Sequence, residues 1–343
     1  MTQKRVLVFG ASGFIAMYLI DELIAKGYAV TVTDVADSSA NYYLGRGLTL
    51  IKVDITAQEQ FQKLPIENYE AVIHLAAHQP ANVSGKNDPA DYVRVNVIGT
   101  LNVLDFCVKT GAKKIIYCSS HRNTQGLWAD KTIVSEKDGR AIKFSGEYAM
   151  FSISESAAQD CVTHFETEHC LPGIIFRLPP VYGYGPHTQI FREGKRVKTG
   201  FQIFIDRAAA GEALEIWGDP DLGRDIIYVK DVVAALLLAV ENNGVTGLYN
   251  IASGYLLTLR EQVETIAKLF WRAAGPPVFH FYPEKPNSIE QYVYDISKAE
   301  RDLNWRPKYS FHEMLIDYQN EEQSGRYSYL VNKRNQMFNE TEE

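Results

Sequence analysis

A glycine-rich turn near the N-terminus constrains the fold of this chain more than any other feature. Residues 6–9 are four uncharged apolar residues, which indicates a buried strand, and Gly10 and Gly13 follow it. Apolar residues then recur at helical spacing as far as Gly27, a residue type that commonly ends helices. The pattern predicts a strand, a glycine turn and a helix whose N-terminus can bind a phosphate or pyrophosphate group.

An acidic residue ends the next predicted strand. Residues 29–33 are apolar or β-branched, and Asp34 follows them, close to the roughly 20 positions after the first glycine at which dinucleotide-binding folds carry a carboxylate. That carboxylate accepts a ribose hydroxyl and would repel a 2′-phosphate, so we predict a site for NAD rather than NADP. The alternative is an ordinary βα unit whose glycines only tighten a turn. Ala16 stands at the third glycine position, where alanine is allowed.

Apolar runs and helical patterns alternate along the rest of the chain. Further strands are expected at residues 48–55, 71–77, 115–118, 174–178, 226–229 and 248–252. Helices are expected at residues 90–111 and 149–169. This alternation predicts an α/β fold with a doubly wound parallel sheet, the Rossmann arrangement, and a smaller C-terminal α/β domain.

The expected domain boundaries follow from these patterns. Residues 1–180 are assigned to the NAD-binding domain, with 226–252 returning to it; residues 181–225 and 253–320 to the substrate domain; and residues 321–343 to a C-terminal tail. Regular patterning stops over residues 184–225, which predicts a long irregular region. The tail has weak periodicity, so we expect a loose segment or a subunit contact.

Composition excludes several classes of function. A net charge of −7 with a pI near 5.7 argues against a nucleic-acid or anionic-membrane surface. No run of 18 apolar residues occurs, and neither a signal peptide nor a membrane span is expected, so the cytoplasm is the predicted location. The four cysteines lack ligand spacing and are expected to be reduced packing residues, and no metal site is predicted.

Several motifs together resemble those of the extended short-chain dehydrogenase/reductase family, in particular its nucleotide-sugar epimerases and dehydratases. They are the glycine turn at residues 10–16, Asp54-Ile55, HLAA at 74–77, NVIGTLN at 96–102, RDIIYV at 224–229, and DISKA at 295–299 with WRP at 305–307. The last two are typical of the sugar-nucleotide branch. The resemblance extends over nearly the whole chain.

The resemblance implies a set of binding residues. Those expected to contact NAD are Gly10, Ser12, Gly13, Phe14, Ile15, Asp34, Asp54, Ile55, Leu75, Ala76, Ala77, Asn96, Ser119, Tyr148 and Pro179. Those expected to contact a nucleotide sugar are Ser120, His121, Tyr148, Phe204, Trp217 and Arg224. A basic patch formed by Arg192, Lys195, Arg196 and Lys198 is either a loop that faces substrate phosphate or a solvated surface.

The catalytic positions of the family are only partly retained. The resemblance implies that Tyr148 is the base that takes a sugar hydroxyl proton, yet Ser152 stands at the position of the family lysine and His121 at that of the Ser/Thr. His121 could act as the acid/base group, could lower the pKa of Tyr148 as an imidazolium, or could merely fill the turn. Arg122 or Lys143 could instead supply the missing positive charge.

Two functions remain open on this basis. The leading hypothesis is an NAD-dependent nucleotide-sugar epimerase that oxidises a sugar carbon transiently, expected at C4, with Tyr148 and His121 as acid/base groups and Ser152 at the third catalytic position. Arg122 and Asn123 stand where dehydratases of the family carry an acidic pair, which disfavours 4,6-dehydration. The alternative is a catalytically silent homologue that binds NAD and a sugar nucleotide as a sensor or partner subunit. In either case the family resemblance implies a homodimer.

Overall fold

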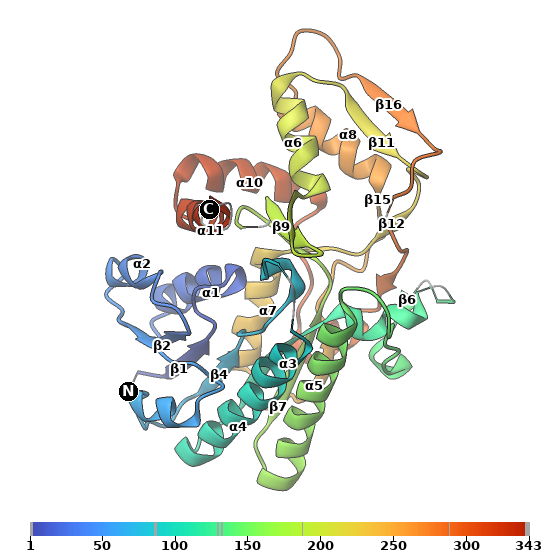
Figure 1. Ribbon diagram of the computed structural model, residues 1–343. Helices are drawn as coiled ribbons and strands as arrows, with labels where there is room; N and C mark the ends of the chain where they lie inside the picture. The colour runs from blue at the N-terminus through green and yellow to red at the C-terminus, as the bar shows by residue number, and fades with distance from the viewer. Residues whose placement is uncertain are drawn as a thin grey trace.

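The computed structural model describes residues 3–85, 88–128, 130–131, 133–186, 188–287 and 289–339. At its centre is a seven-stranded sheet in the order β14-β7-β5-β4-β1-β2-β3, with every neighbouring pair parallel (Figure 1). The strands are β1 (Arg5–Phe9), β2 (Ala29–Asp34), β3 (Leu50–Lys52), β4 (Ala71–His74), β5 (Ile115–Ser120), β7 (Gly173–Leu178) and β14 (Gly247–Asn250). The predicted doubly wound parallel sheet is confirmed.

Helices cover both faces of this sheet. One face carries α1 (Phe14–Ala25), α2 (Ala40–Leu44) and α7 (Val229–Glu241); the other carries η1 (Gln58–Lys63), α3 (Pro89–Tyr92), η3 (Val93–Ile98), α4 (Gly99–Thr110) and α5 (Ala149–His169). Alternate residues of β1 enter different cores: Val6 and Val8 pack on the α1 side, whereas Leu7 and Phe9 pack on the α4 side. Both faces of the strand are therefore buried, as its uncharged apolar sequence predicted.

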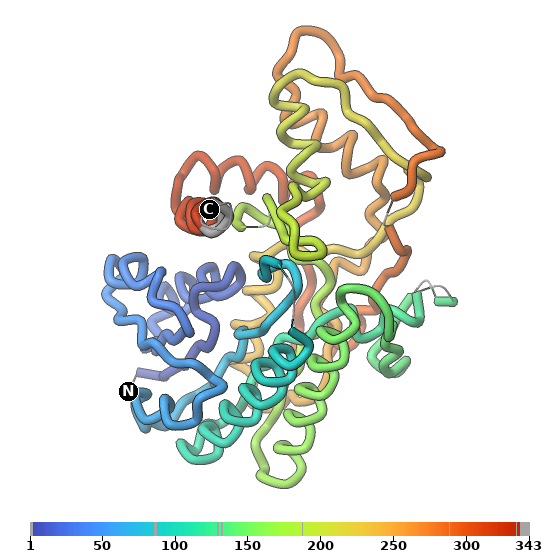
Figure 2. Tube along the Cα trace, in the orientation of Figure 1, coloured from blue at the N-terminus to red at the C-terminus, as the bar shows by residue number. Residues whose placement is uncertain are grey.

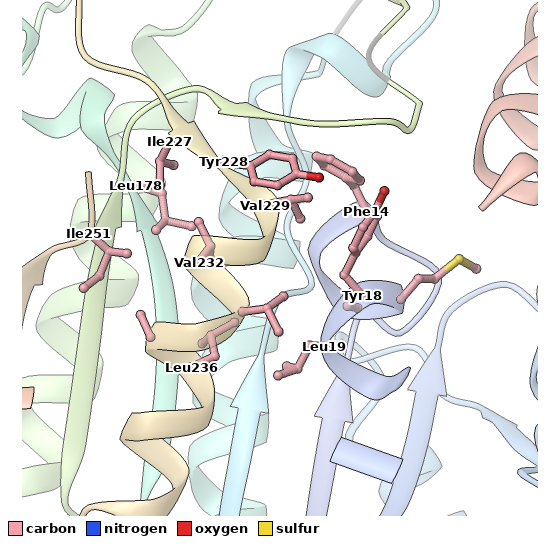
Figure 3. Close-up of a cluster of buried hydrophobic side chains, with 14 of the residues drawn as sticks. Phe14, Tyr18, Leu19, Leu178, Ile227, Tyr228, Val229, Val232, Leu236 and Ile251 are labelled. Atoms are coloured by element: carbon pink, nitrogen blue, oxygen red, sulfur yellow. The ribbon is translucent and has the colours of Figure 1, made fainter. Parts of the chain in front are cut away.

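Figure 3 shows the packing of α1 against α7. Leu19 of α1 lies on the side that faces Leu236 of α7, and both side chains are fully buried. Each such side chain contributes about 1.5–3 kcal/mol through burial. This contact fixes the helix that follows the glycine turn against the sheet.

A second group of elements stands beyond the carboxyl ends of the strands (Figure 1). It contains β8 (Val181–Tyr182), β9 (Gln189–Arg192), β10 (Lys195–Lys198), α6 (Gly200–Ala210), β11 (Leu214–Trp217), β12 (Gly223–Arg224), β13 (Ile227–Tyr228), β15 (Leu257–Thr258), α8 (Leu259–Phe270), β16 (Phe279–Tyr282) and β17 (Val293–Tyr294). Helix α9 (Ser297–Leu303) instead packs beside β14 and α7 at the edge of the sheet. The short elements η2 (Pro80–Asn82), η4 (His121–Leu127), β6 (Ile133–Val134) and η5 (Glu136–Asp138) complete this side.

The prediction of an irregular region at residues 184–225 is wrong. This stretch forms the β9–β10 hairpin, helix α6 and strand β11. Thr199 caps α6, since its side chain accepts a hydrogen bond from the Gln202 N–H. The hairpin carries mostly polar side chains, so it leaves no apolar periodicity in the sequence.

The C-terminal tail is also ordered, so the prediction of a loose segment is wrong for the described residues. Helix α10 (Phe311–Ser324) ends at Gly325, whose φ of 66° turns the chain into α11 (Ser328–Asn339). Tyr327 and Leu330 are both 2% exposed and belong to the main core. Figure 2 shows this C-terminal segment lying over the N-terminal part of the chain. Residues 340–343 lie outside the described residues.

Candidate active site

The glycine turn joins β1 to α1 at the edge where the parallel strands end. Gly10 has a φ of +79°, and a Cβ atom there would lie 2.6 Å from the Ala76 nitrogen and 2.8 Å from the Leu75 carbonyl carbon. Gly13 is the N-cap of α1, and no side chain of the described residues caps this helix. The first N–H groups of α1 are therefore left for an anionic ligand, which suits a dinucleotide pyrophosphate.

Asp34 lies beside this turn at the end of β2. Its carboxylate accepts hydrogen bonds from the Ser12 N–H at 2.9 Å and the Ala36 N–H at 3.2 Å. The Ser12 and Ser39 hydroxyls are 2.5 Å apart, which ties the turn to the start of α2. A carboxylate next to open helix N–H groups matches the donors and acceptors that NAD presents along its ribose and pyrophosphate.

Two more motifs shape the wall of this cleft. Asp54 accepts hydrogen bonds from the Thr56 N–H and hydroxyl, and Asn102 donates to the Ile55 carbonyl at 2.7 Å. A Cβ on Gly99 would lie 2.6 Å from the Ile55 side chain, so the glycine lets the helix approach that residue. The NVIGTLN motif thus packs against the Asp54-Ile55 pair predicted to contact NAD.

Asn96 connects the end of β4 to α5. Its side-chain oxygen accepts from the His78 N–H at 2.7 Å, and its Nδ2 donates to the His78 carbonyl and to Ser154 Oγ. It therefore holds the segment that follows Leu75, Ala76 and Ala77 in place. Its contact with NAD stays a prediction, as do those of Phe14, Ile15 and Pro179.

Tyr148 lies at the N-terminal end of α5, beneath Arg122. The Arg122 guanidinium carbon is 4.3 Å from the centre of the Tyr148 ring. Burial raises the pKa of Tyr148, and the charge of Arg122 opposes that shift. Lys143, the other candidate for the missing cation, instead pairs with Glu290 at 3.2 Å. Of the two alternatives, the structure places Arg122 at the tyrosine.

His121 stacks in an aromatic cluster at the end of β5. Its ring lies 5.6 Å from Trp128 and 5.8 Å from Tyr292, both nearly parallel to it. Its Nδ1 is 3.1 Å from the Leu178 carbonyl oxygen, which can only accept, so Nδ1 carries the proton and Nε2 is the free base.

The charge state of His121 follows from its surroundings. Burial, together with the charges of Arg122 and Arg224, holds the pKa of His121 well below its usual value. The structure therefore does not support an imidazolium at this position, because the neutral ring is favoured. His121 can accept a proton or a hydrogen bond at Nε2 but cannot replace the missing lysine charge.

The serines of the predicted site take part in local hydrogen bonds. The Ser152 hydroxyl donates to the Tyr148 carbonyl at 2.9 Å, within the first turn of α5. Ser119 Oγ accepts from Asn123 Nδ2 at 3.0 Å, and Ser120 Oγ accepts from the Arg122 N–H at 3.2 Å. These contacts fix the shape of the turn that carries Arg122.

The predicted substrate residues fall into two groups. Arg224 is part of β12, where its backbone bridges Tyr292, and its charge reaches His121. Its Nε is buried and has no hydrogen-bond partner among the described residues. Phe204 packs from α6 against the core, and Trp217 ends β11 with 45% of its surface exposed and Lys285 4.5 Å from its ring. The structure thus brings Arg224, but not Trp217, into the His121 cluster.

The basic patch lies on the β9–β10 hairpin, which borders Tyr148. The Glu193 N–H donates to Glu147 Oε1 at 2.6 Å, and the Gly85 N–H donates to the Gly194 carbonyl at 3.1 Å. Arg192 is close enough for its charge to act on Tyr148. Lys195 and Arg196 are exposed, and Lys198 pairs with Asp206. Arg192 therefore borders the site, whereas Lys198 is already paired on the surface.

Sequence reasoning missed Trp128 and Tyr292. Their rings stack 4.0 Å apart, and both are buried. Neither belongs to a motif, and they come from the end of η4 and the segment before β17, so only the fold brings them together.

No cluster of three or more His, Cys, Asp or Glu side chains suited to a metal ion occurs among the described residues. The four cysteines are unpaired, and Cys170 is exposed rather than packed. Across the described residues, no helix has both the length and the apolar character needed to cross a bilayer.

Residues 6–252 match the sequence profile of the NAD dependent epimerase/dehydratase family. The chain belongs to this family. The prediction of NAD as the cofactor is thereby confirmed, and so is the resemblance to the extended short-chain dehydrogenases.

Similar proteins within and around the family differ in reaction. UDP-glucuronic acid decarboxylase 1 of Arabidopsis thaliana is 25% identical over 92% of this chain and 70% of its own length. The UDP-glucose 4-epimerase of Thermotoga maritima, solved with UDP-glucose, is 27% identical with a TM-score of 0.75, and the match covers 93% of this chain and 99% of that chain. The UDP-glucose 4-epimerase of Thermus thermophilus, solved with NAD, is 25% identical with a TM-score of 0.71, covering 92% and 99%.

Proposed function

We propose that this protein is an NAD-dependent epimerase of a nucleotide-linked sugar, with transient oxidation at C4. Tyr148 and His121 are the acid/base groups, and Arg122 supplies the positive charge that the family lysine would provide. The observation that carries the proposal is the position of the Arg122 guanidinium, 4.3 Å from the centre of the Tyr148 ring. Gly10, Gly13 and Asp34 would hold NAD, which would supply the reversible hydride acceptance that the oxidation needs.

Each residue has a defined task in this scheme. Tyr148, as the phenolate, takes the proton of the sugar hydroxyl at its phenolic oxygen and later gives it back. Arg122 favours that phenolate because its charge lies directly over the ring. His121 is neutral before the reaction begins, and its Nε2 is free to accept a hydrogen bond or to take up a proton during the reaction. Arg224, half-buried near His121, is the proposed partner of the substrate diphosphate.

A chain of contacts holds Arg122 over the tyrosine. Arg122 donates to Gln125 Oε1 at 3.2 Å, and Gln125 donates to Glu290 Oε2 at 2.6 Å. Glu290 lies in the segment expected to form the substrate domain, whereas Arg122 lies in the segment expected to bind NAD. A residue of the first segment therefore helps to position a residue of the second. This arrangement supports the proposed role because the cation is fixed by tertiary contacts and not by the α5 sequence.

The proposal is tested by incubating the protein with NAD and a panel of UDP-, GDP-, CDP- and dTDP-linked sugars, with products separated by chromatography. We expect conversion of at least one sugar to its epimer, and we expect Tyr148→Phe to abolish it while weakening NAD binding far less. Turnover that persists at the wild-type rate in Tyr148→Phe would contradict the assigned base.

The second candidate function is a catalytically silent sensor or partner subunit. The observation that favours it is Ser152, whose hydroxyl bonds to the α5 backbone and leaves no lysine-like group on that turn. In the same panel this candidate predicts binding of a sugar nucleotide, measured by calorimetry, without any product.

We also propose that the protein forms a homodimer through the α4–α5 face. Val93, Ile98 and Val108 are 42–44% exposed on the continuous helical segment formed by η3 and α4. Apolar side chains along one helix face are suited to pack on a second copy. Sedimentation velocity would distinguish a dimer from a monomer.

A further inference from the structure

The C-terminal helix α11 packs beside α1 and α2, the two helices next to the glycine turn and Asp34, where the adenosine half of NAD is predicted to bind. The Tyr327 ring stacks on Tyr18 of α1, with centroids 3.7 Å apart and an interplanar angle of 20°. Arg326 Nε donates to Asp21 Oδ2 at 3.0 Å, and the Asp21 side chain is only 5% exposed. The start of α11 is therefore anchored on α1.

One face of α11 then continues over the β2–α2 turn, which begins at Asp34. The Tyr329 ring lies 5.7 Å from Tyr42 of α2, and its buried hydroxyl lies beside Ser38. Lys333 is four residues further on, so it projects from the same face one turn later. The negative charge of the Asp34 carboxylate favours the protonated form of Lys333 and so raises its pKa. Figure 1 shows α11 beside α1 and α2.

Two features make Lys333 unusual for a surface lysine. Its side chain is half-buried, and burial lowers the pKa of Lys333 while Asp34 opposes that shift. Residues 6–252 carry the family match, so this helix is outside the segment that defines the family. The lysine is thus an additional charge near Asp34, the residue predicted to bind the ribose.

We propose that α11 forms the outer wall of the adenosine half of the NAD site, and that Lys333 contacts the adenosine ribose and its phosphate. Asp34 accepts ribose hydroxyls from one side, and the Lys333 ammonium donates from the other. Tyr327 and Leu330 are buried in the core and hold the start of α11 in this position. The inference rests on the NAD site and not on the sugar chemistry of the proposed function.

The test measures binding of ADP-ribose, which contains the adenosine half without nicotinamide, by titration calorimetry. We expect Lys333→Met to weaken ADP-ribose about tenfold, and to speed NADH release by a similar factor in stopped-flow fluorescence. Asn332→Ala is the matched control, because Asn332 is exposed on the same helix. An ADP-ribose affinity within twofold of wild type for a folded Lys333→Met protein would overturn the proposal.

A second measurement separates a direct contact from mere neutralisation of Asp34. In an Asp34→Asn background, a direct contact predicts that Lys333→Met still weakens ADP-ribose, whereas a pure pairing with Asp34 predicts no further loss and contradicts the proposed contact. Hydrogen exchange of the full chain adds a readout that needs no variant. Amides of α11 are expected to gain protection with ADP-ribose, and unchanged exchange would also count against the wall.

Discussion

At the level of single residues, Arg122 most distinguishes this site, since its guanidinium lies over Tyr148 while Ser152 occupies the lysine position. A guanidinium stays protonated at every relevant pH and stacks on the face of an aromatic ring. A lysine at position 152 would instead reach Tyr148 from within α5. Burial raises the pKa of Tyr148 above its usual value even with Arg122 beside it, so the charge of Arg122 reduces the free-energy cost of forming the phenolate.

The first prediction concerns this charge. Removing it in Arg122→Met raises the pKa of Tyr148, so the limb of the rate profile that requires phenolate moves to higher pH. We expect kcat at neutral pH to fall by roughly tenfold, because less of Tyr148 is then in the phenolate form. The pH dependence of kcat measures it, and Arg122→Lys should recover part of the rate. An unchanged pH dependence of kcat in Arg122→Met would show that the charge of Arg122 does not act on Tyr148.

A second prediction belongs to the glycine turn. In Gly10→Ala, the new Cβ would lie 2.6 Å from the Ala76 nitrogen, so the turn must open and NAD binding should fall at least tenfold. Gly27→Ala is the matched control, since Gly27 has nearly the same φ, +81°, with no atom within 4 Å of the added carbon. It should cost only about 1 kcal/mol of stability. Fluorescence titration with NADH measures the affinity for the dinucleotide, and thermal denaturation measures stability. We expect the affinity to fall in Gly10→Ala and not in Gly27→Ala.

The sequence was sufficient for some of these residues and not for others. Gly10 and Asp34 could be predicted because the turn and the strand end are local in the chain. Arg122 could be named only as one of two candidates, because its position depends on Gln125 and on Glu290 from a distant segment. The charge state of His121 depends on burial and on Arg224, which no local pattern contains.

At the level of elements, packing of α1 against α7 holds the cofactor turn in place (Figure 3). Leu236 of α7 is fully buried in this contact. We expect Leu236→Ala to lower the free energy of unfolding by roughly 2–5 kcal/mol, the cost of a core leucine cavity. Leu44→Ala, at a side chain that is 69% exposed, should change it by less than about 0.5 kcal/mol. Urea denaturation gives both free energies of unfolding. Equal losses in Leu236→Ala and Leu44→Ala would mean that the α1–α7 contact contributes no more to stability than an exposed side chain.

Elements differ in how much of them the sequence reveals. Helix α5 spans Ala149–His169, the range that its pattern predicted. Helix α11 was missed because its anchors are not sequence neighbours: Tyr327 packs on Tyr18 and Arg326 bonds to Asp21, both on α1. A short amphipathic pattern cannot indicate a partner so far away along the chain.

At the scale of the whole molecule, buried carboxylates connect elements that are distant in sequence. Asp225 accepts hydrogen bonds from the Ser253 N–H and hydroxyl and from the Gly254 and Tyr294 N–H groups, which ties β12 to the β14 end and to β17. Burial raises the pKa of Asp225 to about 6. Such groups make the stability of the whole fold depend on pH.

Glu155 gives the clearest case. It is buried on α5, Tyr117 donates to its Oε2 at 2.8 Å, and its Oε1 has no partner among the described residues. Burial raises the pKa of Glu155 to about 7. Because the folded pKa exceeds the unfolded value, this group stabilises the fold below about pH 4.5, and that contribution is lost as pH rises through about 7.

Glu155→Gln removes this titration while keeping an oxygen that can accept from Tyr117. We expect the variant to match wild type near pH 5 and to be more stable at pH 8, by on the order of a few kcal/mol, because wild type must then bury a charge. Urea denaturation of both proteins at several pH values between about 5 and 8 measures the difference between their free energies of unfolding. Asp225 titrates in both proteins, so it does not contribute to this difference. Glu168→Gln, exposed on the same helix, should follow wild type throughout. Parallel curves for wild type and Glu155→Gln would mean that Glu155 ionises in the folded protein as it does in water.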